Sequence, residues 1–167
     1  MMPILIRSDN GRNTGIFESI DLWKVLRQEL RIYAKPIGSL PHSLQNKLLG
    51  PPFLINDIQL QYLKELNKID FDPGITGEIY EVFKEFTRKG YMLKDGMKFG
   101  CDFVGYPGDP LYCHATLMIV VTNFIEKFRL VELGRIAHDT QKELVMAWKD
   151  EEGVKIMKLA WVSTGAR

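Results

Sequence analysis

Apolar residues in the first 30 positions follow strand spacing and then helix spacing. Residues 3–7 and 15–18 are short apolar runs on either side of an Asn10-Gly11 turn signal, which predicts a β-hairpin. Leucine and tryptophan then recur every three or four residues up to Leu30. Ser19 precedes this run and is a favourable N-cap residue. The pattern therefore predicts a hairpin followed by one amphipathic helix.

Residues 35–52 interrupt this periodicity. They are rich in proline and glycine, which predicts a long ordered loop or a string of turns and no regular element. Helical spacing of apolar residues resumes over residues 57–69, with Asn56 or Asp57 as the expected N-cap. The first part of the chain should thus combine short strands with two helices.

The second half opens with a strongly amphipathic pattern. Its apolar side chains recur at i, i+3, i+4 and i+7, which predicts a helix over residues 77–89 with Thr76 as the N-cap. Gly90 stands at the C′ position that commonly ends a helix. A strand then leads to Asp95-Gly96, a strong signal for a tight hairpin. We expect its second strand over residues 98–104, with one face buried.

The remaining pattern alternates between strands and a helix. A continuous apolar run predicts a buried strand over residues 114–122. A short helix is expected over residues 130–138. Two further strands, over residues 142–149 and 154–163, should be joined by an acidic turn. This order predicts an α/β (α+β) fold built on a mixed sheet.

The turn signal Asp72-Pro73-Gly74 separates the two patterns and is the candidate domain boundary. We expect a small mixed α/β N-terminal domain over residues 1–70. A C-terminal α/β domain with a mixed sheet should occupy residues 75–167.

Charge and cysteine content restrict the classes of function. The 167 residues include 22 basic and 21 acidic side chains, so the net charge is only +1. A protein that binds nucleic acid by charge alone is usually more basic, so any RNA binding must be local or shared with partners. Cys101 and Cys113 form neither a disulfide framework nor a zinc pattern, and we expect both to be buried in a reducing compartment. No signal peptide and no membrane span is predicted, which indicates a soluble intracellular protein.

The candidate chemistry gathers in the loop from Tyr106 to His114. Tyr106 lies between a glycine and a proline, and His114 lies at the start of the buried strand. Lys142 begins a later strand. Tyrosine, histidine and lysine suit metal-free RNA cleavage, which needs a base for the 2′-OH, an acid for the leaving 5′-oxygen and a cation beside the phosphorane.

Each of these residues also has a structural interpretation. Tyr106 could anchor the loop through its ring and hydroxyl. His114 and Lys142 could be ordinary residues at strand ends. Asp109, between Gly108 and Pro110, is expected to make a turn hydrogen bond within the loop. Asp102 could bind a metal, but it has no obvious carboxylate partner in the sequence.

The segment Arg88–Ala115 carries a family resemblance. It reads RKGYMLKDGMKFGCDFVGYPGDPLYCHA and closely resembles the catalytic domain of tRNA-splicing (tRNA-intron) endonucleases, whose pattern includes KFG, DF, GDP and HA at these spacings. The likeness extends through Gly134-Arg135 to Lys142. A weaker likeness links Ile37–Leu54 to the N-terminal domain of the eukaryotic subunit that cuts the 3′ splice site. The resemblance implies a restriction-endonuclease-like catalytic domain.

The resemblance also implies a role for particular residues. Tyr106 would be the general base, His114 the general acid and Lys142 the transition-state stabiliser, with no metal and no cofactor. Arg135 and Trp161 match the residues that clamp a bulged base, and a guanidinium and an indole can sandwich a base by stacking and cation–π contact. Three further residues would shape the catalytic loop: Gly105, Gly108 and Asp109.

The function implied is that of the catalytic subunit that cuts precursor tRNA at the 3′ splice site, leaving a 2′,3′-cyclic phosphate and a 5′-OH. The near-neutral charge favours a complex with other chains, and the final strand offers an edge for pairing. The resemblance implies that the partners are other endonuclease subunits in the nucleus, in a heterotetramer with a homodimer as the variant. One alternative is a non-catalytic structural subunit of the same complex. Another is a metal-dependent, restriction-type nuclease that uses Asp102 or Asp109 with Lys142.

Overall fold

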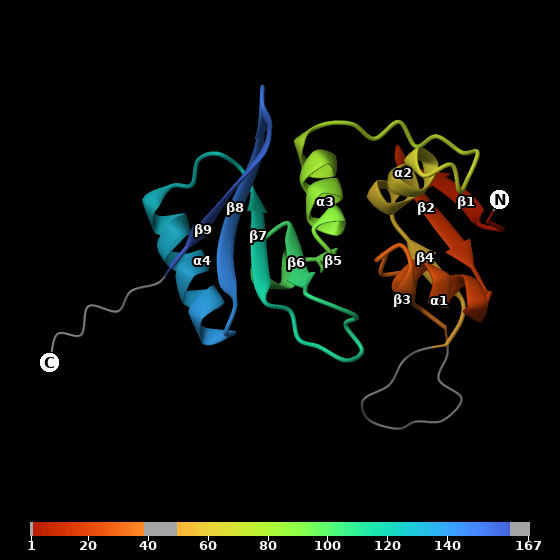
Figure 1. The fold of residues 1–167 in the computed structure, drawn as a ribbon, viewed down its shortest axis with the longest axis horizontal. Helices are drawn as coiled ribbons and strands as arrows, with labels where there is room; N and C mark the ends of the chain where they lie inside the picture. Colours follow the sequence, from red (N-terminus) through yellow and green to blue (C-terminus); the bar gives the residue numbers. More distant parts are fainter. Residues whose placement is uncertain (1, 39–49, 161–167) are drawn as a thin grey trace, which may run out of the picture. The chain divides into compact units, whose positions relative to one another are not determined.

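The computed structural model describes residues 2–38 and 50–160. The chain divides after Ile75 into two compact units, Met1–Ile75 and Thr76–Arg167. Figure 1 shows the four-stranded sheet of the first unit and the five-stranded sheet of the second. Within the described residues, no helix is both long enough and apolar enough to cross a membrane.

The sheet of the first unit has the strand order β1-β2-β4-β3. The predicted hairpin is confirmed: β1 (Leu5–Asp9) pairs antiparallel with β2 (Arg12–Phe17) across Asn10-Gly11, whose φ values of 48° and 75° are both left-handed. β4 (Phe53–Ile55) pairs with β2 on one side and with the short β3 (Lys35–Pro36) on the other. The prediction of no regular element over residues 35–52 is therefore wrong at Lys35–Pro36. Proline is tolerated there because β3 is an edge strand.

Two helices complete the first unit, and both predicted N-caps are confirmed. Ser19 Oγ accepts from Leu22 N (3.1 Å) at the start of α1 (Ile20–Gln28). Asn56 forms a reciprocal capping box with Gln59 at the start of α2 (Asp57–Glu65). α2 ends four residues earlier than expected, before Asn67 adopts a left-handed φ of 54°. The core between helices and sheet consists of fully buried apolar side chains, chiefly Leu26, Ile32, Ile55, Leu60 and Leu63.

The second unit is an α/β structure with a mixed sheet, as predicted. Its strand order is β5-β6-β7-β8-β9, and only β7 and β8 run parallel. The strands are β5 (Met92–Asp95), β6 (Phe103–Tyr106), β7 (Leu117–Val121), β8 (Glu143–Asp150) and β9 (Gly153–Leu159). Helices α3 (Glu78–Arg88) and α4 (Lys127–Asp139) lie on opposite sides of this sheet (Figure 1).

The two faces of the sheet bury different side chains. Phe103 of β6 contacts Phe83 of α3, with ring centroids 5.9 Å apart. Val104, the next residue of β6, packs in a separate cluster with Leu133 and Ala137 of α4. This alternation is what a strand buried on both faces requires.

The ends of α3 correct one prediction and confirm another. Thr76 is not the N-cap; Gly77 is, with a φ of 103°, and no side chain caps the helix. That backbone conformation favours glycine, which is why the helix starts one residue later than expected. Gly90 does stand at C′, with a φ of 93°. Its N–H bonds Thr87 O and the N–H of Tyr91 bonds Phe86 O, as in a Schellman motif.

The predicted tight hairpin at Asp95-Gly96 is wrong. Asp95 Oδ1 accepts from Met97 N (2.9 Å) and starts a 3₁₀ turn, η1 (Met97–Phe99), which Gly100 ends with a left-handed φ of 72°. β6 therefore begins only at Phe103, opposite Asp95. The local side-chain bond of Asp95 and the left-handed Gly100 favour a compact turn over continuation of the strand.

Candidate active site

The ends of three neighbouring strands meet at one edge of the five-stranded sheet. Gly105 of β6 pairs with Leu117 of β7, and Leu117 pairs with Glu143 of β8. Thr116, which precedes β7, donates its backbone N–H to Gly105 O (2.9 Å) and accepts from Glu143 N (2.8 Å). These bonds fix the carboxyl end of β6 beside the amino ends of β7 and β8.

The three residues expected to be catalytic reach this edge from distant parts of the sequence. Tyr106 is the last residue of β6, Lys142 directly precedes β8, and His114 lies in the loop just before β7. α4 makes this possible, because its crossover returns the chain parallel to β7 at the end where β7 begins. The backbone thus brings Tyr106, His114 and Lys142 to the same edge.

Tyr106 is half-buried, and it ends a strand where a loop position was expected. Its ring packs against the cluster under α4. Lys94 Nζ lies 5.5 Å from the centroid of the same ring, where the negative face of the aromatic system attracts a cation. Lys94 is a neighbour that sequence reasoning missed. In the pairing of β5 with β6, Met92 stands opposite Tyr106, so Lys94, two residues further on, lies diagonally across from Tyr106.

His114 is solvent-exposed and stands in the loop, three residues before the strand in which it was predicted. The loop is shaped by Asp109, whose Oδ1 accepts from Leu111 N (3.0 Å) and whose carbonyl accepts from Tyr112 N and Cys113 N. The Sγ of Cys113 also donates to this carbonyl (3.2 Å). Cys113 is only half-buried, whereas we expected it to be buried. Its contacts with Asp109 help to hold the turn that precedes His114.

The two glycines of the loop differ in how much space a Cβ atom would have at their positions. A Cβ on Gly105 would lie 3.2 Å from Leu117 Cβ, so the close approach of β6 and β7 leaves little room for one. A Cβ on Gly108 would meet only Cys113 Sγ, at an ordinary 3.6 Å. Gly105 thus sets the spacing of the strands at the candidate site, whereas Gly108 does not.

Lys142 is half-buried and its ammonium contacts two neighbouring groups. Its ammonium donates to Thr140 O (2.9 Å) and lies 4.8 Å from the centroid of the Phe99 ring. Its backbone N–H bonds Ala137 O (2.8 Å) in the last turn of α4. The lysine is therefore held between the end of α4 and the 3₁₀ turn η1.

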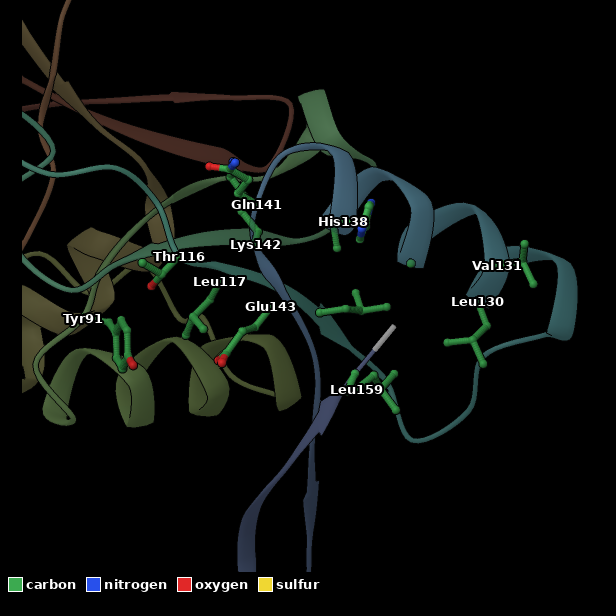
Figure 2. A pocket seen from close by; sticks show the side chains of 14 residues that line it. Tyr91, Thr116, Leu117, Leu130, Val131, His138, Gln141, Lys142, Glu143 and Leu159 are labelled. Carbon is green, nitrogen blue, oxygen red and sulfur yellow. The ribbon is translucent and has the colours of Figure 1, made fainter. Parts of the chain in front are cut away.

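A cavity of about 840 Å³ opens beside Lys142. Figure 2 shows its walls: Leu130, Val131 and His138 come from α4, and Thr116, Leu117 and Glu143 come from the edge of the sheet. The cavity combines an apolar wall with a cation and several hydrogen-bonding groups, which is the usual make-up of a site for an organic ligand.

Of the two residues expected to clamp a base, the structure describes only Arg135. Arg135 is exposed on α4 and lines a second hollow with Lys127 and Phe128, which shares Val131 with the cavity that Lys142 lines. Trp161 lies outside the described residues. The base clamp therefore stays a prediction.

Asp102 is occupied by a structural hydrogen bond. Its Oδ2 accepts from Val121 N (2.7 Å) at the carboxyl end of β7, whereas Lys142 stands at the amino end. Five residues of β7 separate the two ends by about 13 Å at the usual rise of a strand. This separation disfavours a joint site of Asp102 and Lys142. Among the described residues, no three histidine, cysteine or acidic side chains are grouped so that they could hold a metal.

One thiol, that of Cys101, has a strongly raised pKa. Burial raises the pKa of Cys101 from 9.0 to about 11, opposed by a hydrogen bond from the backbone of Ile119. Cys101 is buried, as expected, and its Sγ contacts the carbonyls of Gly96 and Phe103 (3.5 and 3.3 Å). A thiol with a raised pKa is a poor nucleophile, so Cys101 has a packing role.

Comparisons with known proteins agree with this architecture. Residues 77–157 match the family model of the tRNA intron endonuclease, catalytic C-terminal domain. The chain is 32% identical over 89 residues to a protein of Saccharolobus solfataricus named tRNA-splicing endonuclease, an alignment that covers 50% of this chain and 49% of the relative. It is 28% identical over 134 residues to a protein of the same name from Sulfurisphaera tokodaii, with 68% and 74% of the two chains covered.

A third relative of that name, from Saccharolobus islandicus strain L.S.2.15, is 31% identical over 104 residues, with 59% of this chain and 53% of the relative covered. The chain thus spans about half the length of the Saccharolobus relatives that it matches. The match confirms the type of catalytic domain predicted for the second half of the chain.

Proposed function

Residues 77–157 match the catalytic domain of the tRNA intron endonuclease family, and from this premise we propose that the protein is a catalytic endonuclease subunit that cuts precursor tRNA without a metal. The observation that carries the proposal is the shared strand edge, at which the backbone positions of Tyr106, His114 and Lys142 converge. Curated relatives with the name tRNA-splicing endonuclease support the choice of substrate.

Each residue has a defined task in the proposed reaction. Tyr106 takes the proton of the attacking 2′-OH, and His114 gives a proton to the leaving 5′-oxygen. Lys142 stabilises the negative charge of the phosphorane. The 2′-oxygen forms a bond to phosphorus as the bond to the 5′-oxygen breaks, which leaves a 2′,3′-cyclic phosphate and a 5′-OH.

The accessibility of the residues fits these tasks. His114 is exposed and can reach an RNA strand that lies across the sheet edge. Lys142 is one of the residues that line the cavity of about 840 Å³, which is large enough to admit a nucleotide. The exposed Arg135 would contact the same RNA from α4.

The finer proposal is a 3′-splice-site subunit of a nuclear complex with other endonuclease subunits, for which a homodimer is the variant. The net charge of +1 supports shared RNA binding, because one chain offers little general attraction for phosphates. Mass measurement of the active assembly and mapping of the cleaved bond on a precursor tRNA decide between these arrangements.

The proposed chemistry is tested by cleavage of precursor tRNA in EDTA, with the ends of the products identified by their reactivity with phosphatase and kinase. We expect His114→Ala and Lys142→Ala to lower the rate by at least about 100-fold while the assembly forms normally. Lys149→Ala, at the exposed far end of β8, is the control and should cleave normally. Loss of cleavage in EDTA that Mg²⁺ restores would point to the metal-dependent alternative. Full activity of His114→Ala would point to a structural subunit.

A further inference from the structure

The contacts of Lys142 suggest how its ammonium is held in place. A lysine side chain has four rotatable bonds, so it reaches one defined point only if other groups restrict it. Two such groups contact its Nζ: the carbonyl of Thr140 at 2.9 Å, and the Phe99 ring, whose centroid is 4.8 Å away. One comes from the end of α4 and the other from the turn η1.

The Thr140 carbonyl is a strong partner for a cation. Thr140 is the C-cap of α4, where carbonyls lack partners within the helix and the helix dipole is negative. The Thr140 hydroxyl donates to Ile136 O (2.7 Å), which fixes the conformation of this residue. The position of the carbonyl is therefore set by the helix and does not depend on Lys142.

Phe99 is also anchored independently of the lysine. Its backbone N–H bonds Gly96 O (2.8 Å) within η1, and its ring packs on the cluster that includes Leu133 and Ala137 of α4. The guanidinium of Arg129, at the start of α4, bonds the carbonyl of Gly100, the next residue after Phe99. The ring is thus attached to the same helix whose other end presents Thr140.

We propose that Phe99 is a positioning residue for Lys142: its ring face and the Thr140 carbonyl hold the ammonium at the sheet edge, with its remaining N–H groups directed to the RNA phosphate. This role rests on the proposed function of Lys142. An ammonium has three N–H groups, and the carbonyl uses one of them. The ring attracts the cation without accepting a conventional hydrogen bond, so it restricts the lysine and leaves donors available for the reaction.

The chemical requirement is specific for an aromatic ring. Leucine in place of Phe99 would preserve most of the packing on α4 but provide no negative face for the cation. Tyrosine would keep that face. We therefore expect Phe99→Leu to lower kcat for precursor tRNA by roughly 3- to 30-fold, with little change in KM. This fold-change corresponds to the usual strength of a cation–π contact. Phe99→Tyr should retain most of the activity. The control is Phe124→Leu, in the exposed loop before α4, which should leave kcat unchanged.

A double-mutant cycle separates positioning from structure. In the Lys142→Ala background, Phe99→Leu should cause no further loss of kcat, because there is no ammonium to position. An equal loss in both backgrounds would show that Phe99 acts through the fold alone and would overturn the inference. If Lys142→Ala itself cleaves normally, Lys142 does not stabilise the transition state. That result would refute the proposed function of Lys142, and it can be distinguished from a failure of the role proposed for Phe99.

A second measurement needs no catalysis. In NMR spectra of the full chain, the ε-methylene protons of Lys142, assigned by their loss in Lys142→Ala, should be shifted upfield by the Phe99 ring. The shift should persist in Phe99→Tyr and disappear in Phe99→Leu. Unshifted ε-protons in the wild-type protein would overturn the inference whether or not the chain cleaves RNA alone.

Discussion

Replacement of Asp102 by alanine is expected to destabilise the protein and leave the chemistry intact. The Asp102 carboxylate accepts from Val121 N at 2.7 Å in a half-buried position at the end of β7. A hydrogen bond to a charged group contributes about 1.5–3 kcal/mol, and the variant would also leave the Val121 N–H without this partner. We expect a loss of about 2 kcal/mol in the free energy of unfolding. For a unit of this size, that corresponds to a fall in Tm of roughly 8–16 °C.

The assay combines thermal and urea unfolding of the full chain, followed by circular dichroism, with cleavage in EDTA below the lowered Tm. Asp102→Asn keeps an oxygen acceptor and should lose about half as much stability, because its bond is no longer charge-assisted. Asp95→Ala is the matched control. Its carboxylate also accepts one backbone N–H, from Met97 at 2.9 Å, but at an exposed site, so the loss should stay below about 1 kcal/mol.

Two results would refute this reasoning. Equal losses for Asp102→Ala and Asp95→Ala would mean that burial does not strengthen the bond to Val121. A stable Asp102→Ala protein whose cleavage is abolished, and depends on Mg²⁺ in the wild type, would make Asp102 a metal ligand, contrary to its place at the far end of β7.

Two further predictions concern the turn before β6. A Cβ on Gly96 would lie 2.7 Å from Cys101 O and 2.9 Å from Phe103 N, so Gly96→Ala should cost about 2–3 kcal/mol in urea unfolding, whereas Gly108→Ala, with only ordinary contacts, should change stability by less than about 1 kcal/mol. Burial raises the pKa of Cys101 from 9.0 to about 11, so between these pH values the unfolded chain loses a proton that the folded chain keeps. The stabilisation is complete below pH 9 and is lost as the pH rises towards 11. The wild type should therefore lose roughly 1–2 kcal/mol more than Cys101→Ala across this range, measured by urea unfolding at each pH, and parallel curves for the two proteins would contradict the assignment.

Much of the fold follows from local patterns in the sequence. The amphipathic spacing of α3, the N-caps Ser19 and Asn56 and the C′ glycine Gly90 each act within one element, so the sequence alone predicts them. The mixed sheet could be expected because a continuous apolar run, β7, is followed by a helix and another strand.

The parts that sequence reasoning missed depend on contacts between elements. The turn η1 replaces a tight hairpin because Asp95 bonds Met97 N, and the same Asp-Gly pair is equally compatible with the other turn. The contact between Phe99 and Lys142 exists only because η1 and the end of α4 meet, which residue spacing does not reveal. The placement of Tyr106 and Lys142 at neighbouring strand ends likewise depends on the register of three strands.

The parallel pairing of β7 with β8 also has a consequence for folding. Tyr106 and His114 precede α4 in the chain, whereas Lys142 follows it. Parallel pairing needs a long crossover and forms more slowly than local hairpins. A nascent chain that has emerged only as far as β7 therefore holds the proposed base and acid but lacks the cation. On the proposed mechanism, RNA cleavage begins only when the crossover is complete, so activity reports the finished fold of the second unit.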